Sequence, residues 1–422
     1  MLDAKFIREN PEIVRQALKD RNDKFDLDAF LSLDEERRKI MRQIEELHAE
    51  QNKIDNAMKL IIKSKQNPAA KIEEAKEIKK QITALDESFS KLDAQFKEQL
   101  LRIPNIPHSS IPKGHPQNNK IVKEWGERRK FDFKPLDHIV LSDNLDIIDF
   151  KRAAKISGSN FVLFKGIGAK LERALINFML DLHTQKHGYK EIFPPMLVNR
   201  DSMRSTGQLP KLEEDMYRLK DDDFFLIPTA EVPVTNIHRD EVLEESKLPI
   251  YYTAYTACFR REAGSYGKDT KGLMRVHQFD KVELVKFVKP ETSYDELEKL
   301  LANACAILEL LKIPYRILML ATGDISFAAA KCYDIEIYAP GIDKWLEVSS
   351  CSNFEDFQAR RGNIRYKDKE TGKLKFVHTL NGSGVALARL VVAILENYQE
   401  SDESIMIPEV LHSYMGVDSI KA

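Results

Sequence analysis

The chain has 422 residues, 43% of them hydrophobic, and this length allows two or three domains with at least one substantial core. Lysine and arginine number 65 and aspartate and glutamate 67, which leaves a net charge of -2. Bulk charge therefore predicts no polyanionic partner, and any contact with nucleic acid must come from local basic patches.

The N-terminus and the cysteines indicate a cytoplasmic protein. The opening stretch MLDAKFIREN has the features of neither a signal peptide nor a transit peptide, and no apolar run approaches the roughly 18 residues that a membrane span needs. The cysteines lack CxxC spacing and neighbouring histidines: Cys258, Cys305, Cys332 and Cys351. We expect reduced thiols, no disulfide, no structural zinc and no membrane partner.

Two heptad seams predict a pair of long helices near the N-terminus. The first seam comprises Ile40, Ile44, Leu47, Gln51, Ile54, Met58 and Ile61, and the second comprises Ala75, Ile78, Ile82, Leu85, Phe89, Leu92 and Phe96. Asn67 and Pro68 interrupt the pattern between them, since proline cannot continue a helix without cost. The two helices should fold back as an antiparallel coiled-coil arm of roughly 45 Å at about 1.5 Å per residue.

The charge around the turn of this arm favours contact with phosphates. Between Lys53 and Lys80 there are eight lysines and four acids, so the surplus is basic. Basic side chains at the tip of a long arm are suited to binding the phosphate backbone of a nucleic acid. A dimerisation element, a spacer or a solvated helix face would carry similar heptads and charges.

The stretch RIPNIPHSSIPKGHPQNN, residues 102–119, is rich in proline and lacks periodicity, so it reads as a linker. It divides the chain into an N-terminal helical domain, 1–104, and a larger domain, 105–422. In the larger domain helices are expected at 168–187 and 293–311. Strands are expected at 160–166, 190–198, 224–231, 250–262, 279–288, 332–340 and 344–353. This order predicts an α+β fold with a mainly antiparallel sheet flanked by helices.

The segment 257–285 carries polar residues at strand spacing. Arg260 and Glu262 are two apart and should share a strand face, where one could hold a phosphate and the other accept from an amine. Phe279 and Glu283, four apart on the return strand, place an aromatic ring beside an acid. A solvated hairpin with cross-strand ion pairs would look alike.

The loop between these strands interleaves basic and aromatic side chains with glycines: Tyr266, Lys268, Lys271 and Arg275. This composition is typical of a mobile contact with single-stranded nucleic acid, and also of an ordinary flexible surface loop.

Two further clusters could bind a ligand or could be ordinary surface polarity. Thr229 and Glu231 share one face at the end of an expected strand. Glu347 lies between Leu346 and Val348, and an acid in an apolar strand favours a buried partner such as Mg²⁺ or a substrate ammonium. Ser349 and Ser350 follow it closely.

Near the C-terminus, Gly382 and Gly384 precede a long apolar helix that carries Arg389 on its first turns. A dinucleotide fingerprint is excluded because Leu387 occupies the place of the third glycine and no βαβ unit can follow. A P-loop is excluded because no lysine follows the glycines. We expect a tight turn that feeds a buried helix, with a simple helix cap as the alternative.

Taken together, these segments resemble the three signature motifs of class II aminoacyl-tRNA synthetases, and in detail the seryl-tRNA synthetase family. YKEIFPPMLV resembles motif 1, the dimer-forming motif; FRREAGSYGKDTKGLMRVHQFDKVELV resembles motif 2; and LNGSGVALARLVVAILENYQ resembles motif 3. NIPH, TAE, AKCYDIEIY, EVSSCSNFEDFQARR and IPEVLHSYMG also match, so the resemblance covers essentially the whole chain.

The resemblance implies a bacterial-type, homodimeric enzyme that activates L-serine with ATP and Mg²⁺ and transfers it to tRNA(Ser), with tRNA(Sec) as an alternative acceptor. It implies that Arg260, Arg389 and Glu347 act in catalysis. Serine would be bound by Thr229, Ala230, Glu231, Glu283 and Ser383. ATP would be bound by Arg260, Arg261, Glu262, Val276, Phe279, Glu347, Val348, Ser349, Ser350 and Arg389, with Glu347 and Ser350 as Mg²⁺ ligands.

Three positions depart from the family pattern. Ala388 stands where glycine is usual before the motif 3 arginine, Cys332 stands in place of a threonine, and Ala328 stands where serine is frequent. These are small substitutions, which put kinetics rather than activity in doubt. Nothing resembles the zinc-dependent branch of the family, so zinc is not expected.

Rival interpretations are an amino acid:carrier-protein ligase, a non-catalytic tRNA-binding paralogue and a coiled-coil adaptor. The first typically lacks the arm that this sequence keeps. The second would have lost Arg260, Glu283 or Arg389, all of which are present. The third accounts for less than a quarter of the chain.

Overall fold

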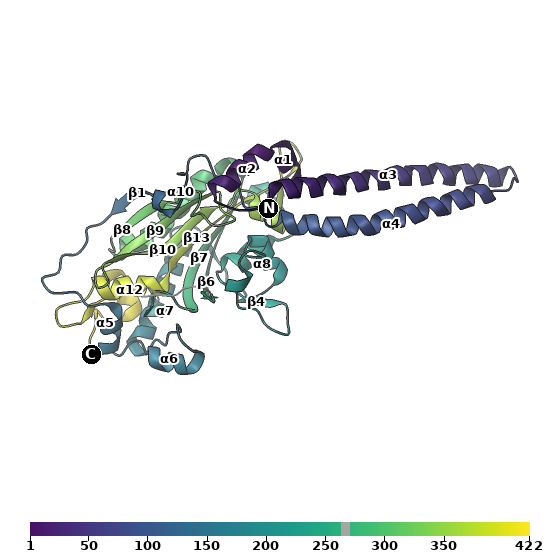
Figure 1. Cartoon of the computed structure of the whole chain (residues 1–422). Coiled ribbons are helices and arrows are strands. Elements are labelled where there is room, and N and C mark those ends of the chain that lie inside the picture. The colour runs from purple at the N-terminus through teal and green to yellow at the C-terminus, as the bar shows by residue number, and fades with distance from the viewer. Residues whose placement is uncertain (263–270) are drawn as a thin grey trace. The chain divides into compact units, whose positions relative to one another are not determined.

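The computed structural model describes residues 1–262 and 271–422 (Figure 1). Its contacts divide the chain into two units. The smaller contains Leu2–Lys19 and Asp23–Pro104, and the larger contains Met1, Asp20–Asn22 and Asn105–Ala422. Each unit has its own apolar core and is described separately.

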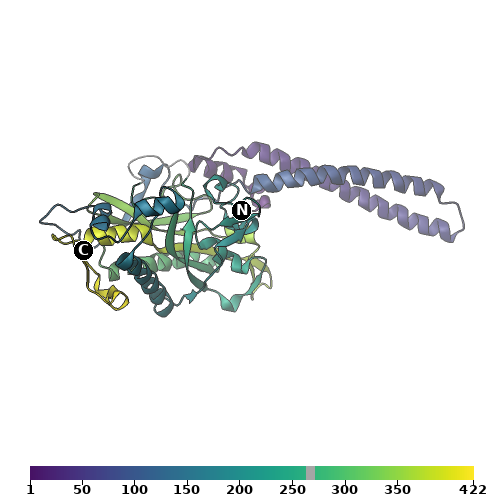
Figure 2. The ribbon, with the colours of Figure 1, turned by 90° about the horizontal axis from the view of Figure 1, so that it is seen from below.

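The smaller unit is helical. Its helices are α1 (Ala4–Glu9), α2 (Pro11–Asp20), α3 (Leu27–Lys63) and α4 (Ala69–Leu100). The side chain of Asp26 accepts from the backbone N–H of Ala29 and caps α3, as expected for an N-cap aspartate. Both ribbon views show α3 and α4 running side by side (Figures 1 and 2), so the predicted antiparallel arm is confirmed.

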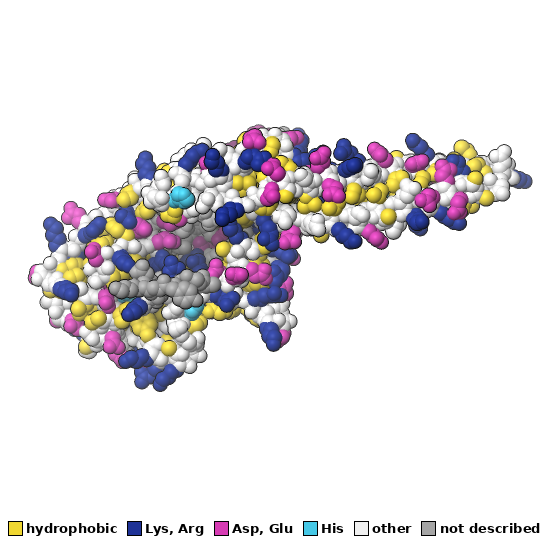
Figure 3. Space-filling model, viewed as in Figure 1, with side chains coloured by type: hydrophobic (Ala, Val, Ile, Leu, Met, Phe, Trp, Pro, Cys, Tyr) yellow, Lys and Arg dark blue, Asp and Glu magenta, His cyan; other side chains and the backbone are white. Residues whose placement is uncertain are grey.

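The heptad seams form the contact between α3 and α4. Every predicted seam residue is buried or half-buried, and Ile54, Ile78 and Ile82 make the central core. At the base of the arm the rings of Phe30 and Phe96 stack at 5.2 Å. Figure 3 shows apolar side chains along the line where the helices meet, with acidic and basic side chains beside them. Packing of these seams, rather than local propensity, holds such long helices together.

The larger unit is built on one eight-stranded sheet. In spatial order its strands are β1 (Lys120–Trp125), β8 (Tyr315–Met319), β9 (Lys331–Ala339), β10 (Lys344–Asn353), β13 (His378–Ala386), β7 (Gln278–Val288), β6 (Ile250–Phe259) and β2 (Lys190–Glu191). Every neighbouring pair is antiparallel except β2 with β6. The predicted α+β class with a mainly antiparallel sheet is confirmed.

Three long helices pack against this sheet: α7 (Gly166–Gln185), α10 (Ser293–Leu310) and α12 (Leu387–Asn397). Their apolar faces join the strands in one large core. The shorter helices are α5 (His138–Asn144), α6 (Phe150–Ser157), α8 (Arg200–Thr206), α9 (Glu231–Thr235), α11 (Phe357–Gly362) and α13 (His412–Met415). The remaining strands are β3 (Leu197–Asn199), β4 (Phe224–Leu226), β5 (Val242–Glu244), β11 (Arg365–Lys367), β12 (Leu374–Phe376), β14 (Ile405–Met406) and β15 (Ser419–Ile420).

Some expected strands are wrong or shorter than predicted. Residues 160–166 form only a single bridge, between Ile148 and Phe164. The segment 190–198 contains β2 and the start of β3, because the prolines between them cannot donate ladder hydrogen bonds. Glu231 begins helix α9, so Thr229 and Glu231 do not lie on a strand. β6 ends at Phe259, so Arg260 and Glu262 follow it rather than sharing its face.

The prediction of a tight turn at Gly382 and Gly384 is also wrong, because both lie inside strand β13. A Cβ on Gly382 would stand 2.6 Å from Cδ2 of Leu300 and 2.8 Å from Sγ of Cys351. A Cβ on Gly384 would stand 2.9 Å from Nε2 of His183. The glycines therefore let the sheet pack closely against α10 and α7.

All four cysteines are buried and free. In the ranges 1–262 and 271–422, no helix combines the length and the apolar character that crossing a membrane requires.

Candidate active site

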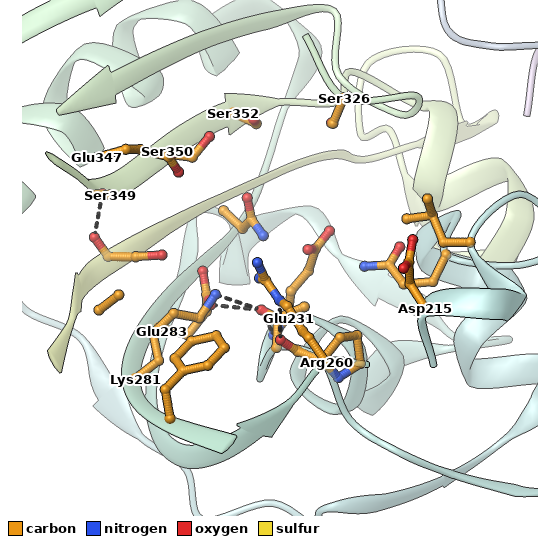
Figure 4. A pocket seen from close by; sticks show the side chains of 18 of the residues that line it. Asp215, Glu231, Arg260, Lys281, Glu283, Ser326, Glu347, Ser349, Ser350 and Ser352 are labelled. Carbon is orange, nitrogen blue, oxygen red and sulfur yellow. Dashed lines mark hydrogen bonds and ion pairs between the residues drawn. The ribbon is translucent and has the colours of Figure 1, made fainter. Parts of the chain in front are cut away.

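One cavity of about 630 Å³ lies in the larger unit, a size typical of small-molecule sites. Side chains reach it from β7, β10, β13, the start of α12 and the segments that lead into α9 and follow β6 (Figure 4). Most of the predicted site residues line it: Thr229, Glu231, Arg260, Glu262, Val276, Phe279, Glu283, Glu347, Val348, Ser349, Ser350, Ser383 and Arg389. The fold thus brings together segments that are far apart in the sequence.

One part of the cavity holds two buried acids and a lysine (Figure 4). Thr229 donates its hydroxyl to Oε2 of Glu283 at 2.8 Å, and Nζ of Lys281 donates to Oγ1 of Thr229 at 2.9 Å. Lys281 also forms an ion pair with Glu283. Burial, followed by the charge of Glu283, raises the pKa of Glu231 to about 7. The carboxylates of Glu231 and Glu283 outnumber the ammonium of Lys281, so this part of the cavity is suited to one further cation.

Arg260 and Phe279 form a second part of the cavity. The guanidinium carbon of Arg260 lies 5.1 Å from the centroid of the Phe279 ring, and its Nε donates to the carbonyl of Pro228 at 3.3 Å. Glu262 has a left-handed backbone, φ 49°, and accepts from Arg275 at 2.9 Å. This φ re-aims Glu262 after the strand has ended, which an alternating strand pattern would not do.

Arg389 projects from the first turn of α12 toward β10. Its NH1 donates to the backbone carbonyl of Glu347 at 2.6 Å and lies 3.8 Å from the Glu347 carboxylate. Its Nε donates to the carbonyl of Met274 at 3.4 Å. The guanidinium is thus held over the cavity by backbone contacts from two sides.

The side chain of Glu347 is 49% exposed, although it stands between the buried Leu346 and Val348. Its exposure follows the ordinary alternation of a strand, and the register of β10 against β9 shifts only after it, between Glu347 and Ser349, where the alternation ends and Ser349 is buried. Figure 4 shows Glu347 and Ser350 along the same strand.

Ser349 and Ser350 lie on opposite faces of β10. Ser349 is buried and donates to the backbone carbonyl of Ser383 at 2.6 Å. Ser350 lies 3.1 Å from Sγ of Cys332 and faces Asp334 across the ladder. Burial, with the nearby charge of Glu347, raises the pKa of Asp334 above its usual range. The thiol of Cys332, which stands where the family usually has threonine, therefore contacts Ser350, a predicted Mg²⁺ ligand.

Two predicted residues lie outside the cavity lining. Ala230 is fully buried in a core next to Val234. Arg261 is exposed, and its NH1 donates to the carbonyl of Glu214 at 3.1 Å. Tyr266 and Lys268, expected to contact single-stranded nucleic acid, fall outside the described residues. Ala328 and Ala388, two of the departures from the family pattern, do line the cavity.

Lys281 and Asn381 are among the polar residues lining the cavity that sequence reasoning missed. Lys281 lies between Phe279 and Glu283 at strand spacing, so the same face of β7 carries all three. Asn381 stands two residues before Ser383 on β13. The alternation that identified their neighbours could have identified both.

Comparisons with known proteins agree along the full length. Residues 1–107 match the model of the seryl-tRNA synthetase N-terminal domain, and residues 214–398 match that of the tRNA synthetase class II core domain (G, H, P, S and T). The serine--tRNA ligase of Carboxydothermus hydrogenoformans is 54% identical, over 100% of this chain and 99% of that protein. The serine--tRNA ligase of Thermodesulfovibrio yellowstonii is 53% identical, over 100% of both.

The structural comparison gives the same family. The crystal structure of seryl-tRNA synthetase from Pyrococcus horikoshii complexed with ATP has a TM-score of 0.93 and 38% identity, and the match covers 100% of this chain and 99% of that one. The arm and the catalytic core are both included in these matches. The chain therefore belongs to the seryl-tRNA synthetase family of class II aminoacyl-tRNA synthetases.

Proposed function

We propose that the cavity performs serine activation for a serine--tRNA ligase. The observation that carries this proposal is that one cavity contains both a buried pair of acids, Glu231 and Glu283, and two arginines, Arg260 and Arg389. Acids in a desolvated site suit the substrate ammonium, and arginines suit phosphates. The match to a solved seryl-tRNA synthetase that binds ATP supports ATP as the co-substrate.

Serine would lie against Glu231, Thr229, Glu283 and Ser383, with Ala230 shaping the wall behind them. The carboxylates bind the ammonium, and the polar groups bind the side-chain hydroxyl. A site that is built to hydrogen-bond a hydroxyl rejects alanine strongly, because buried polar groups would be left unpaired.

ATP would extend from Phe279 to Arg389. In this arrangement Phe279 stacks on the adenine, Glu262 accepts from the adenine amine, and Arg260 binds the α-phosphate. Arg389 binds the terminal phosphates. The remaining predicted contacts to ATP would come from Val276, Val348 and Ser349, which line the cavity, and from Arg261, which lies outside the lining next to Arg260.

Glu347 and Ser350 would hold Mg²⁺. Their oxygens are hard donors of the kind that Mg²⁺ prefers, and the crowding of Asp334 by Glu347 indicates a place where a cation would relieve repulsion. Mg²⁺ would neutralise phosphate charge there. Across residues 1–262 and 271–422, no three His, Cys, Asp or Glu side chains cluster as a metal site.

The chemistry needs no protein nucleophile. A carboxylate oxygen of serine attacks the α-phosphorus in line, the bond to the bridging oxygen breaks, and pyrophosphate leaves. The 3′-hydroxyl of tRNA then attacks the carbonyl carbon of seryl-adenylate and AMP leaves. Arg260 and Arg389 contribute by positioning the phosphates and by neutralising their charge.

The arm would bind the tRNA(Ser) through shape and phosphates rather than base sequence. Lys59, Lys63 and Lys65 are exposed around its turn. A homodimer is proposed through motif 1, where Phe193 is 76% exposed beside the edge strand β2. We also propose a cytoplasmic location. Charging of tRNA(Sec) remains part of the hypothesis.

Glu283→Gln tests the serine subsite. Loss of the charge should raise the KM for serine about tenfold or more in ATP–pyrophosphate exchange, because a hydrogen bond to a charged group contributes roughly 1.5–3 kcal/mol, while the KM for ATP stays near the wild-type value. The matched control is Glu296→Gln, which alters a buried acid that pairs with Lys286 at 2.9 Å outside the cavity. Equal effects of the two variants on the KM for serine would place Glu283 outside the serine site.

A further inference from the structure

Glu231 is held by side-chain amides. Nε2 of Gln358 donates to Oε1 of Glu231 at 2.5 Å and to the backbone carbonyl of Thr206 at 3.1 Å. The side-chain amide of Asn381, which lines the same cavity, also lowers the pKa of Glu231. Glu231, Gln358 and Asn381 are all buried. Among the residues that the structure describes, no ion pair to Glu231 is found within 4.0 Å, so neutral donors orient this carboxylate.

Thr379 fixes which end of the Gln358 amide faces Glu231. Oγ1 of Thr379 donates to Oε1 of Gln358 at 2.8 Å, and Thr379 is itself buried on β13. An amide oxygen can only accept and an amide nitrogen can only donate. With its oxygen engaged by Thr379, Gln358 must direct its NH₂ group toward Glu231 and Thr206. The network runs from β13 through α11 to the first residue of α9.

The surroundings of Glu231 would favour its protonated form if the side-chain amides were absent. Glu283 and Lys281 face it from β7, and Arg260 lines the same cavity. Burial and the charge of Glu283 favour the neutral acid, whereas the hydrogen bond from Gln358 and the nearby amide of Asn381 favour the carboxylate. The amides therefore decide whether Glu231 can meet a substrate ammonium as a charged partner near neutral pH.

We propose that Gln358, locked by Thr379, is a positioning residue of the serine site that keeps Glu231 ionised and aimed at the substrate ammonium. Gln358 itself does not line the cavity, so it acts on serine through Glu231. The inference rests on the proposed function, in which Glu231 binds serine.

The sharpest test is Thr379→Val, which removes one hydroxyl and keeps the shape of the side chain. We expect the KM for serine at pH 7 to rise several-fold to about tenfold, because Gln358 loses its orientation, while the KM for ATP stays unchanged. The pH midpoint below which serine binding weakens should move to higher pH, since a less solvated carboxylate gains its proton more readily. Thr253→Val is the matched control, because the Thr253 hydroxyl is buried and has no hydrogen-bond partner among the described residues.

A second variant, Gln358→Leu, removes the donor outright. We expect a larger rise in the KM for serine, on the order of tenfold to a hundredfold, with the same direction of pH shift. Gln399→Leu is its control, because Gln399 is also buried but donates to the carbonyls of Leu136 and Glu396. The Tm of each variant separates a folding defect from a change at the site.

The outcomes distinguish this inference from the proposed function. An active wild-type enzyme whose Thr379→Val and Gln358→Leu variants keep the serine KM and the pH midpoint would overturn the role of Gln358 alone. So would a fall in kcat without any movement of the pH midpoint. A wild-type chain without serine-dependent exchange would overturn the proposed function and this inference with it.

Discussion

Replacement of Arg389 by alanine is expected to lower serine-dependent ATP–pyrophosphate exchange by about 10²- to 10³-fold, the range observed when one preorganised donor to a developing charge is removed. The guanidinium is held toward β10 by the carbonyl of Glu347 and by that of Met274. Alanine removes the charge that the terminal phosphates would meet. The fold should remain because Arg389 lines the cavity, where its partners, the carbonyls of Glu347 and Met274 and the Glu347 carboxylate, can be hydrated. Exchange kinetics and Tm are the measurements.

Arg316→Ala is the matched control for this variant. Arg316 lies on β8 of the same sheet, has 23% of its side chain exposed and donates to Glu336 at 2.6 Å, but does not line the cavity. It should leave exchange within about a few-fold of wild type, as expected for a partly exposed ion pair. Near-normal exchange in Arg389→Ala would return Arg389 to a purely structural role.

Deletion of residues 35–97 should separate activation from charging. The cut ends can be rejoined by a short glycine-rich linker, because α3 and α4 lie side by side at the base of the arm, as the 2.8 Å ion pair between Arg37 and Asp93 of the intact chain shows. Exchange should stay largely intact, since every residue that lines the cavity lies beyond residue 200. Charging of tRNA(Ser) should collapse, because the phosphate contacts of the arm are lost.

A charge-reversal variant tests, without a deletion, whether the arm is needed for charging but not for activation. Lys59→Glu, Lys63→Glu and Lys65→Glu together reverse charge on the exposed turn of the arm and leave the seams untouched. Relative to wild type, charging should fall more at low salt than at high salt, because salt screens the phosphate contacts that the variant has lost, and exchange should not change. Lys369→Glu with Lys373→Glu, on the exposed loop between β11 and β12, is the control. Equal loss of exchange and charging in the arm variants would contradict separate roles.

The arm was the part of the fold most open to prediction from sequence. Ile54 belongs to the seam of α3, and Ile78 and Ile82 belong to the seam of α4. Each seam has heptad spacing, because a helix packed along its length against a partner buries residues at that period. Segments whose shape depends on neighbours were harder. Gly382 and Gly384 read as a turn because glycine is frequent in turns, whereas here α10 and α7 approach the strand so closely that a Cβ would not fit.

In the candidate site, too, some residues could be predicted from sequence spacing and others could not. Phe279 and Glu283 were predicted on one face of a strand, and both line the cavity. Arg260 and Glu262 also line it, but for another reason, since β6 has ended and the left-handed backbone at Glu262 sets the direction of its side chain. Gln358 stands in the family-matching segment EVSSCSNFEDFQARR, but the sequence does not show its role, because that role comes from contacts with β13 and α9 that only the folded chain creates.

The most direct measurement is ATP–pyrophosphate exchange with each of the twenty amino acids, followed by charging of tRNA with whichever amino acid responds. Exchange confined to serine, followed by transfer to the serine-accepting tRNA, is the predicted result. Exchange with serine but no transfer to tRNA would favour a carrier-protein ligase, and no exchange with any amino acid would contradict the account of the cavity as a site of serine activation.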